Sequence, residues 1–212
     1  MRRTLSFFAC LALAAPFAAA QDLKPIPLPK PRSEGGMPLM QALKERKSTR
    51  EFGPGTFSPE MLANLLWAAF GVNRPDGRRT APTAVNKQEI DIYVATPDGV
   101  YLYDAKANVL QPVVSGDLRG ATGKQPFVKD VAVNLVYVAD MSRMGEIAEP
   151  QRVLYSAADT GFIAQNVYLF CASEGLATVV RAWVDQEVVA KAFKLRPEQR
   201  VILAQSVGYP KK

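Results

Sequence analysis

The hydrophobic positions of the chain recur with two different spacings. Apolar residues at every third or fourth position, the spacing of one helix face, predict helices over residues 37–45, 59–70, 151–174 and 186–194. Alternating or continuous apolar runs bounded by turn residues predict strands over residues 90–95, 100–103, 109–114, 131–138, 176–183 and 201–207. The continuous run at 131–138 predicts a central strand that is buried on both faces.

Three of the predicted helices carry end signals. Ser58 is a helix N-cap followed by Pro59 at the first helical position, and Gly71 is placed to end the same helix. Gly175 follows the long helix as a left-handed C-terminal residue, and Asp185 is the N-cap of the last short helix. In the first helix, Leu39, Met40 and Leu43 are predicted to form one buried face.

The long helix at 151–174 is apolar around almost its whole circumference. Such a helix needs a large core or a partner chain to cover it. Four small residues would allow a second helix to approach closely: Ala157, Ala158, Gly161 and Ala164. Gln165 and Asn166 need hydrogen-bond partners if they are buried, which either a ligand or a neighbouring backbone could supply.

Five residues after the first helix, Arg46-Lys47-Ser48-Thr49-Arg50, carry three cations and two hydroxyls with no acid among them. Arginine presents a planar fork of donors that matches phosphate oxygens, and serine adds a short neutral donor. Arg46, Ser48 and Arg50 could therefore enclose a monophosphate. The alternative is a solvated helix end, because basic residues also favour the negative end of the helix dipole.

Composition narrows the function classes. A chain of 212 residues is one domain's worth, and its net charge of +6 comes from Lys and Arg that are spread along the sequence. No basic-aromatic module suggests nucleic-acid binding. Histidine is absent and there are two cysteines, which argues against a zinc site or a histidine-based catalytic triad.

The N-terminal residues 1–20 have the pattern of a signal peptide. A short basic start precedes an apolar run, and three alanines lead to a cleavage site predicted after Ala20. The run is shorter than the roughly 20 residues that cross a bilayer, so we expect no membrane span after cleavage. The mature protein is then periplasmic or secreted, by either the general or the twin-arginine route. Its single cysteine, Cys171, excludes an intrachain disulfide.

Residues 21–36 are rich in proline and glycine and predict a linker, either an extended tether or a disordered segment, before a domain at 37–212. Further on, residues 73–79 form a turn-rich basic loop. That loop leads to Pro82, Thr83 and Asn86, where a tight backbone could lie close to a flat ligand. Asn86 can both donate and accept a hydrogen bond, although an ordinary loop explains the proline equally well.

The order of these motifs resembles the nitroreductase family of flavin mononucleotide (FMN) enzymes over about residues 37–210. The resemblance is carried by Arg46-x-Ser48-x-Arg50 with Glu51-Phe52, the helix about ten residues on, and Arg79 to Asn86. Residues 80–88 and 99–104 are most similar to the branch containing the azoline-oxidising dehydrogenases, which form thiazoles and oxazoles. Val85 stands where members of this branch commonly have glycine.

The resemblance implies an α+β fold with a mixed, mainly antiparallel sheet flanked by helices. It also implies a homodimer with the long helix at its two-fold interface and FMN at two sites between the subunits. The residues that it assigns to FMN are Arg46, Lys47, Ser48 and Arg50 at the phosphate, Pro82, Thr83 and Asn86 beside the ring, and Arg181 and Lys211.

The expected function is an exported FMN-dependent oxidoreductase that passes hydride or electrons through the flavin by ping-pong exchange, with no required side-chain acid or base. Its substrate is a small molecule or a peptide. Outside the cytoplasm, a quinol or a redox protein could replace a nicotinamide as electron donor. The alternative is an exported, non-catalytic ligand-binding or scaffold protein on the same fold.

Overall fold

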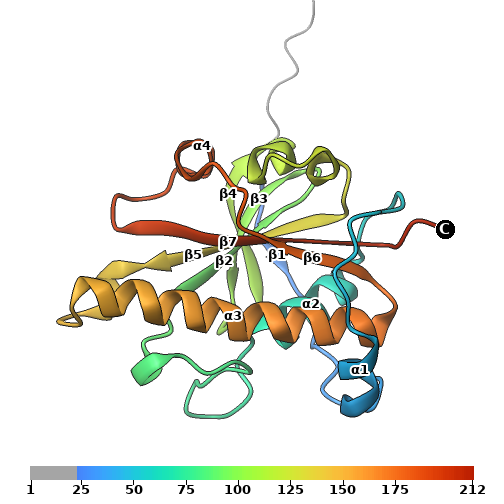
Figure 1. Ribbon diagram of the computed structural model, residues 1–212, viewed down its shortest axis with the longest axis horizontal. Coiled ribbons are helices and arrows are strands. Elements are labelled where there is room, and N and C mark those ends of the chain that lie inside the picture. Colours follow the sequence, from blue (N-terminus) through green and yellow to red (C-terminus); the bar gives the residue numbers. More distant parts are fainter. Residues whose placement is uncertain (1–22) are drawn as a thin grey trace, which may run out of the picture.

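A seven-stranded sheet forms the centre of the computed structural model, which describes residues 23–212 (Figure 1). The predicted signal peptide lies outside these residues. The strands are β1 (Ile26–Pro27), β2 (Ile90–Ala95), β3 (Gly99–Asp104), β4 (Val109–Ser115), β5 (Val133–Asp140), β6 (Ala177–Arg181) and β7 (Gln199–Gly208). Their order is β1-β4-β3-β2-β5-β7-β6, and every neighbouring pair is antiparallel. The α+β prediction is confirmed.

Four α-helices and four short 3-10 helices accompany the sheet in the described part of the chain. The α-helices are α1 (Leu39–Glu45), α2 (Pro59–Phe70), α3 (Glu149–Glu174) and α4 (Gln186–Ala192). The 3-10 helices are η1 (Ala84–Asn86), η2 (Arg119–Thr122), η3 (Pro126–Lys129) and η4 (Met141–Met144). Each predicted cap is confirmed: Ser58 and Asp185 accept backbone N–H groups, and Gly175 is left-handed with φ 67°.

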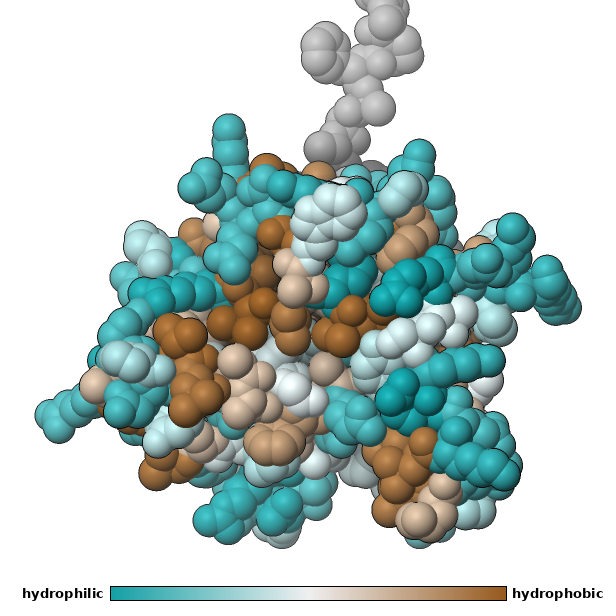
Figure 2. Space-filling view, viewed as in Figure 1, coloured by the Kyte–Doolittle hydropathy of each residue, from teal (hydrophilic) through white to brown (hydrophobic). Residues whose placement is uncertain are grey.

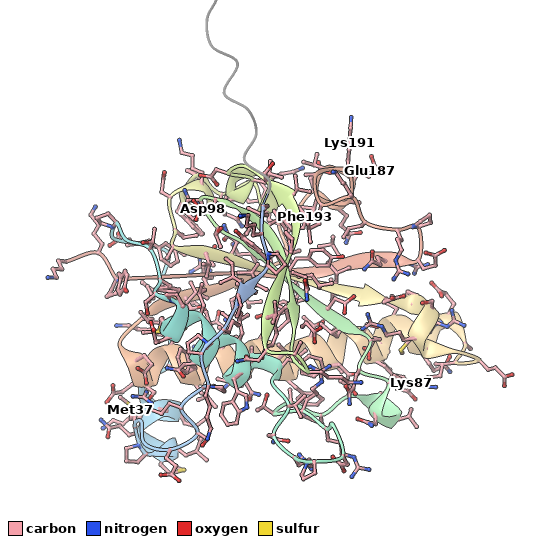
Figure 3. All side chains as sticks on the ribbon, turned by 180° about the vertical axis from the view of Figure 1, so that it is seen from behind. Met37, Lys87, Asp98, Glu187, Lys191 and Phe193 are labelled. Carbon is pink, nitrogen blue, oxygen red and sulfur yellow. The ribbon has the colours of Figure 1, made fainter. Side chains whose placement is uncertain are left out.

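The sheet separates two hydrophobic clusters. On one side α2 and α3 pack Leu66 and Ile163 against strand residues such as Leu135. On the other side lies Phe193, which directly follows α4 and packs its ring 5.8 Å from that of Tyr93 (Figure 3). β5 lies between β2 and β7 with all of its residues buried, as the apolar run predicted.

The prediction for the first helix is wrong. Leu39, Met40 and Leu43 are 63%, 75% and 43% exposed, and Ala42 is the buried residue of α1. A seven-residue helix lies against α3 through this small side chain, which turns its larger apolar side chains outward. Figure 2 shows these hydrophobic side chains on the same face of the molecule as α3.

α3 also leaves apolar side chains uncovered. It buries a face that includes Ile163, Val167 and Cys171, while Leu154 and Phe162 are exposed on the other side together with the small residues around Gly161. One face of α3 therefore packs against a large core, which is one of the two kinds of cover that the sequence analysis required. The other face of α3 is exposed in the single chain.

The stretch predicted as a linker lies against the domain from Leu23 onward. Ile26–Pro27 forms the edge strand β1 beside β4, and the Asn108 amide donates to the carbonyls of Leu28 and Pro29. Arg32 pairs with Glu174 at the end of α3. The described part of this stretch is thus an extended tether held by hydrogen bonds and differs from a disordered linker. Within residues 23–212, no helix has both the length and the apolar character to cross a membrane.

Candidate functional site

The basic segment after α1 runs beside β6. The Arg46 N–H closes α1 on the Ala42 carbonyl, and the Thr49 N–H donates to the Thr178 carbonyl at 2.9 Å. Every second residue lines a pocket of about 550 Å³: Glu45, Lys47, Thr49 and Glu51. This alternation is that of an extended backbone, so Arg46, Ser48 and Arg50 belong to its other side.

Tyr168 of α3 is the side chain on which this other side converges. Its hydroxyl accepts a hydrogen bond from the Val180 N–H at 2.9 Å and lies 2.7 Å from Ser48 Oγ. Either hydroxyl could donate in the Ser48–Tyr168 contact. Because the tyrosine oxygen already accepts from the strand, we infer that the tyrosine O–H donates to Ser48 and that the serine proton is left for a ligand.

Arg46 adds a cation at the same place. Its guanidinium lies over the Tyr168 ring, 5.0 Å from the centroid, in cation–π geometry. Its Nε is buried and has no hydrogen-bond partner within the described residues. A buried N–H without a partner calls for an acceptor. A phosphate oxygen fits this need, and Arg50, which is exposed on the same side of the segment, supplies a second cation.

Lys47 and Lys211, predicted to join the phosphate site, lie in the 550 Å³ pocket instead. The carboxylates Glu45 and Glu51 line the same pocket, and the Lys211 N–H reaches the Glu51 carbonyl at 3.4 Å. Two carboxylates beside two lysines leave little net positive charge for a phosphate dianion. The two lysines therefore lie on the pocket side of the segment, and Tyr168, which contacts Arg46 and Ser48, also lines this pocket.

Arg181, also predicted at the cofactor, is buried with its guanidinium bonded inside the protein. Nε donates to Ser206 Oγ, and the terminal nitrogens donate to the Thr122 carbonyl and to Asn134 Oδ1. Burial among these neutral acceptors lowers the pKa of Arg181 to about 10. The Arg181 side chain therefore connects β6 to β5 and β7 through these hydrogen bonds. It is not directed at Arg46 or Ser48.

Pro82, Thr83 and Asn86 lie on the turn around η1. The Asn86 N–H donates to the Thr83 carbonyl, and the Gln88 N–H donates to Thr83 Oγ1. Val85 has φ 50° and is 76% exposed. This left-handed conformation suits glycine and is unfavourable for a β-branched residue, which gives a physical reason for the glycine of the resembled branch.

α3 separates this turn from the basic segment. The turn meets α3 at Asp159, whose Oδ2 accepts the Ala84 N–H at 2.8 Å, whereas the basic segment meets it at Tyr168. These two residues are nine positions apart, about 14 Å along the helix axis and half a turn around it. Within one chain, the two groups of predicted cofactor residues therefore lie on opposite sides of α3.

Sequence reasoning missed the two residues of α3 that organise these groups. Tyr168 and Asp159 appeared only as members of a long apolar helix. The available signal was that a tyrosine hydroxyl or a carboxylate on a buried helix face needs a hydrogen-bond partner. Asn166, which the sequence analysis expected to need a partner, donates a long hydrogen bond of 3.4 Å from its side-chain amide to the Ala69 carbonyl.

Comparison with known proteins gives consistent matches. Residues 43–209 match the sequence model of the nitroreductase family. A curated protein of Methanocaldococcus jannaschii, named as a nitroreductase, is 32% identical over 161 residues, which cover 71% of this chain and 81% of that protein.

Two solved structures share the fold. A crystal structure from Ralstonia eutropha, also described as a nitroreductase, is 41% identical with a TM-score of 0.87, covering 98% of this chain and all of the other. The NADPH:FMN oxidoreductase of Vibrio harveyi in complex with NAD+ is 20% identical with a TM-score of 0.61, over 82% of this chain and 69% of its own.

Proposed function

Given that this chain belongs to the nitroreductase family, we propose that it is an oxidoreductase that works with bound FMN. The observation that carries the proposal is an unpartnered, buried Arg46 Nε over the Tyr168 ring, whose hydroxyl also contacts the Ser48 hydroxyl at 2.7 Å. Arg46, Ser48 and Arg50 would hold the phosphate. Bound FMN would supply the redox chemistry, taking reducing equivalents from one molecule and passing them to another.

Two subunits complete each FMN site in this proposal. The turn at 83–86 and the basic segment contact opposite sides of α3 at residues nine positions apart, which favours their belonging to different FMN sites. A two-fold axis at the outer face of α3 would place the turn of one subunit near the basic segment of its partner. The exposed Leu154 and Phe162 of α3, together with the apolar side chains of α1, support an interface there.

The protein acts outside the cytoplasm, after cleavage of residues 1–20. Nicotinamide cofactors are cytoplasmic, so we propose that a quinol or a redox protein reduces the flavin. The donor then leaves before the acceptor binds, in ping-pong exchange. The resemblance of residues 80–88 and 99–104 to the azoline-oxidising branch supports a small molecule or a peptide as acceptor or substrate.

The test is FMN titration of the purified mature protein, followed by visible absorption and by the quenching of flavin fluorescence. The wild-type protein is expected to bind FMN. Arg46→Ala, which removes a charge-assisted donor, should weaken binding about 10- to 100-fold. Lys47→Ala is the matched control: it removes a neighbouring cation on the pocket side and should leave binding within about twofold.

The result also distinguishes the oxidoreductase from a non-catalytic protein. A yellow protein that is reduced by a donor and reoxidised by an acceptor supports the proposal. Failure to bind FMN at high concentration, or equal losses for Arg46→Ala and Lys47→Ala, would contradict the assigned phosphate site.

A further inference from the structure

The turn from Thr83 to Gln88 is held in a strained conformation. Val85, Asn86 and Gln88 have φ values of 50°, 53° and 49°. Such left-handed conformations cost residues such as Val85 and Gln88 about 1 kcal/mol or more each, whereas asparagine tolerates them better. They persist only where neighbouring contacts hold them, so the anchors of this turn decide its position.

Two long-range hydrogen bonds anchor the turn: Arg143 donates to the Gln88 carbonyl at 3.1 Å, and the Ala84 N–H donates to Asp159 Oδ2 at 2.8 Å. The bond to Asp159 connects the turn to the N-terminal half of α3, beneath which the turn lies with Lys87 (Figure 3). Asp159 is 2% exposed. The geometry of the turn therefore depends on the state of a buried carboxylate.

A second carboxylate, that of Glu89, lies within hydrogen-bonding reach of the Asp159 carboxylate. Glu89, at the end of the turn, is fully buried, and neither of its carboxyl oxygens has a geometric hydrogen-bond partner within residues 23–212. The hydroxyls of Ser156 and Thr160, on the same face of α3 as Asp159, are also buried without partners. These four side chains form a polar cluster inside the protein, which we name the Glu89 cluster.

Within the described residues, no cation pairs with the Glu89 cluster. The charged side chains on adjoining elements are Arg79, Lys87, Asp140, Arg143 and Arg152. The arginines have other partners: Arg143 pairs with Asp91 at 2.8 Å and donates to the Gln88 carbonyl, Arg79 donates to the Gln88 side chain, and Arg152 donates to backbone carbonyls. Asp140 pairs with Arg196, and Lys87 Nζ extends toward Gly145.

Two carboxylates in one buried site without a cation cannot both stay ionised at low cost. We propose that Glu89 and Asp159 hold a single proton between them at neutral pH, and that this protonated pair keeps the Thr83–Gln88 turn in place. Both are positioning residues. The consequence for FMN rests on the proposed function, whereas the proton and the turn do not.

The geometry assigns the proton to Glu89. Asp159 accepts the Ala84 N–H at 2.8 Å, which favours its ionised form. Glu89 is fully buried, and this burial outweighs the opposing effect of its own backbone N–H. Burial raises the pKa of Glu89 to about 7, and burial also raises the pKa of Asp159. When Glu89 loses its proton, two negative charges repel each other, and the Asp159–Ala84 bond at the edge of the Glu89 cluster is the contact that can open.

The test measures amide hydrogen exchange at Ala84 in the ligand-free, full-length mature protein by NMR, normalised to the intrinsic rate at each pH. In wild type, protection of this amide should fall about tenfold or more between about pH 6 and pH 9. Glu89→Gln, which mimics the protonated acid, should keep protection across the range. Asp159→Ala, which removes the acceptor, should lose it at every pH. Glu146→Gln, at an exposed acid, is the control.

A flat wild-type profile, or the same pH-dependent loss in Glu89→Gln, would overturn the proposal. If Glu89→Gln does not fold, infrared spectroscopy of wild type labelled with ¹³C at glutamate gives an independent answer: a protonated carboxyl band at neutral pH is expected, and its absence would also overturn the proposal. Because no flavin is present, these results are separate from the FMN titration. A protein that binds no FMN can still show the pH-dependent turn.

Discussion

Ser48 and Tyr168, 120 positions apart in the chain, lie 2.7 Å apart through their hydroxyl oxygens. The contact places the basic segment against the C-terminal half of α3, and the Val180 N–H fixes the tyrosine from β6. One hydroxyl therefore connects three elements. With the tyrosine as donor, the serine proton is left for a ligand, as the proposed phosphate site requires.

Removing that hydroxyl is the first prediction. Tyr168→Phe keeps the ring under Arg46 but leaves Ser48 without its donor and Val180 N–H without its acceptor. We expect about 1–2 kcal/mol lower unfolding free energy and FMN binding weakened about tenfold. Chemical denaturation and FMN titration measure the two effects.

The matched control is Tyr155→Phe, on the same helix, for which the structure gives no side-chain hydrogen bond. It should change neither quantity by more than about 0.5 kcal/mol. If Tyr168→Phe binds FMN as tightly as Tyr155→Phe does, the serine orientation inferred from the Tyr168 contact is wrong.

The sequence predicted the elements well because local signals define them. Ser58, Asp185 and Gly175 act within a few residues of their own positions, and each is confirmed. The exposed face of α1 was not predictable in the same way. Leu39 and Met40 have the spacing of a buried face, and helical periodicity does not distinguish a core from a surface that a second subunit covers.

The candidate site was predictable only in part. Composition alone identified the basic segment. Arg46 and Lys47 look equivalent in sequence. Only the extended backbone beside β6 places their side chains on opposite sides of this segment. Arg181 was assigned through the resemblance, whereas its side-chain partners on Thr122 and Asn134 depend on strand pairing and loop packing. Long-range contacts of this kind leave no periodic signal.

The strained turn gives a second prediction. Val85→Gly relieves a β-branched residue at φ 50°, and the gain exceeds the added flexibility of the unfolded chain. We expect unfolding free energy to rise by about 0.5–1 kcal/mol, a gain of roughly 1–4 °C in Tm for a domain of this size. Calorimetry of the ligand-free protein measures the shift.

Ala84→Gly is the control for this prediction, since Ala84 lies next to Val85 and has no positive φ. It should lower stability by about 0.5–1 kcal/mol. A destabilised Val85→Gly would mean that the valine side chain makes contacts that outweigh its backbone strain.

Stability should also depend on pH through Glu89. Burial raises its pKa from 4.5 to about 7, so the folded state binds this proton more tightly than the unfolded state does. Unfolding free energy therefore falls as pH rises from about 4.5 to about 7, by up to roughly 3 kcal/mol, and levels off above that range. Asp159, whose pKa is also raised, acts in the same direction.

Denaturant unfolding of wild type and Glu89→Gln over this pH range checks the sign. The glutamine variant should lose most of the decline. Acids with a lowered pKa, such as Asp117, titrate below 3.8 and do not contribute here. A wild-type stability that rises between about pH 4.5 and pH 7 would contradict a proton held on Glu89.

The last prediction concerns the open face of α3. Phe162 is 48% exposed there, and in a two-fold assembly its burial would count once for each subunit. Phe162→Asp replaces both rings with like charges, so we expect the dimer to weaken about thirtyfold or more, from roughly 1 kcal/mol of lost burial per subunit for the exposed half of each ring. FMN binding should fall with it if each site includes the turn of the partner subunit, as we propose. Val188→Asp, an equally exposed apolar residue on α4, should leave the mass in sedimentation equilibrium unchanged. A Phe162→Asp protein that stays dimeric and yellow would place the subunit interface elsewhere.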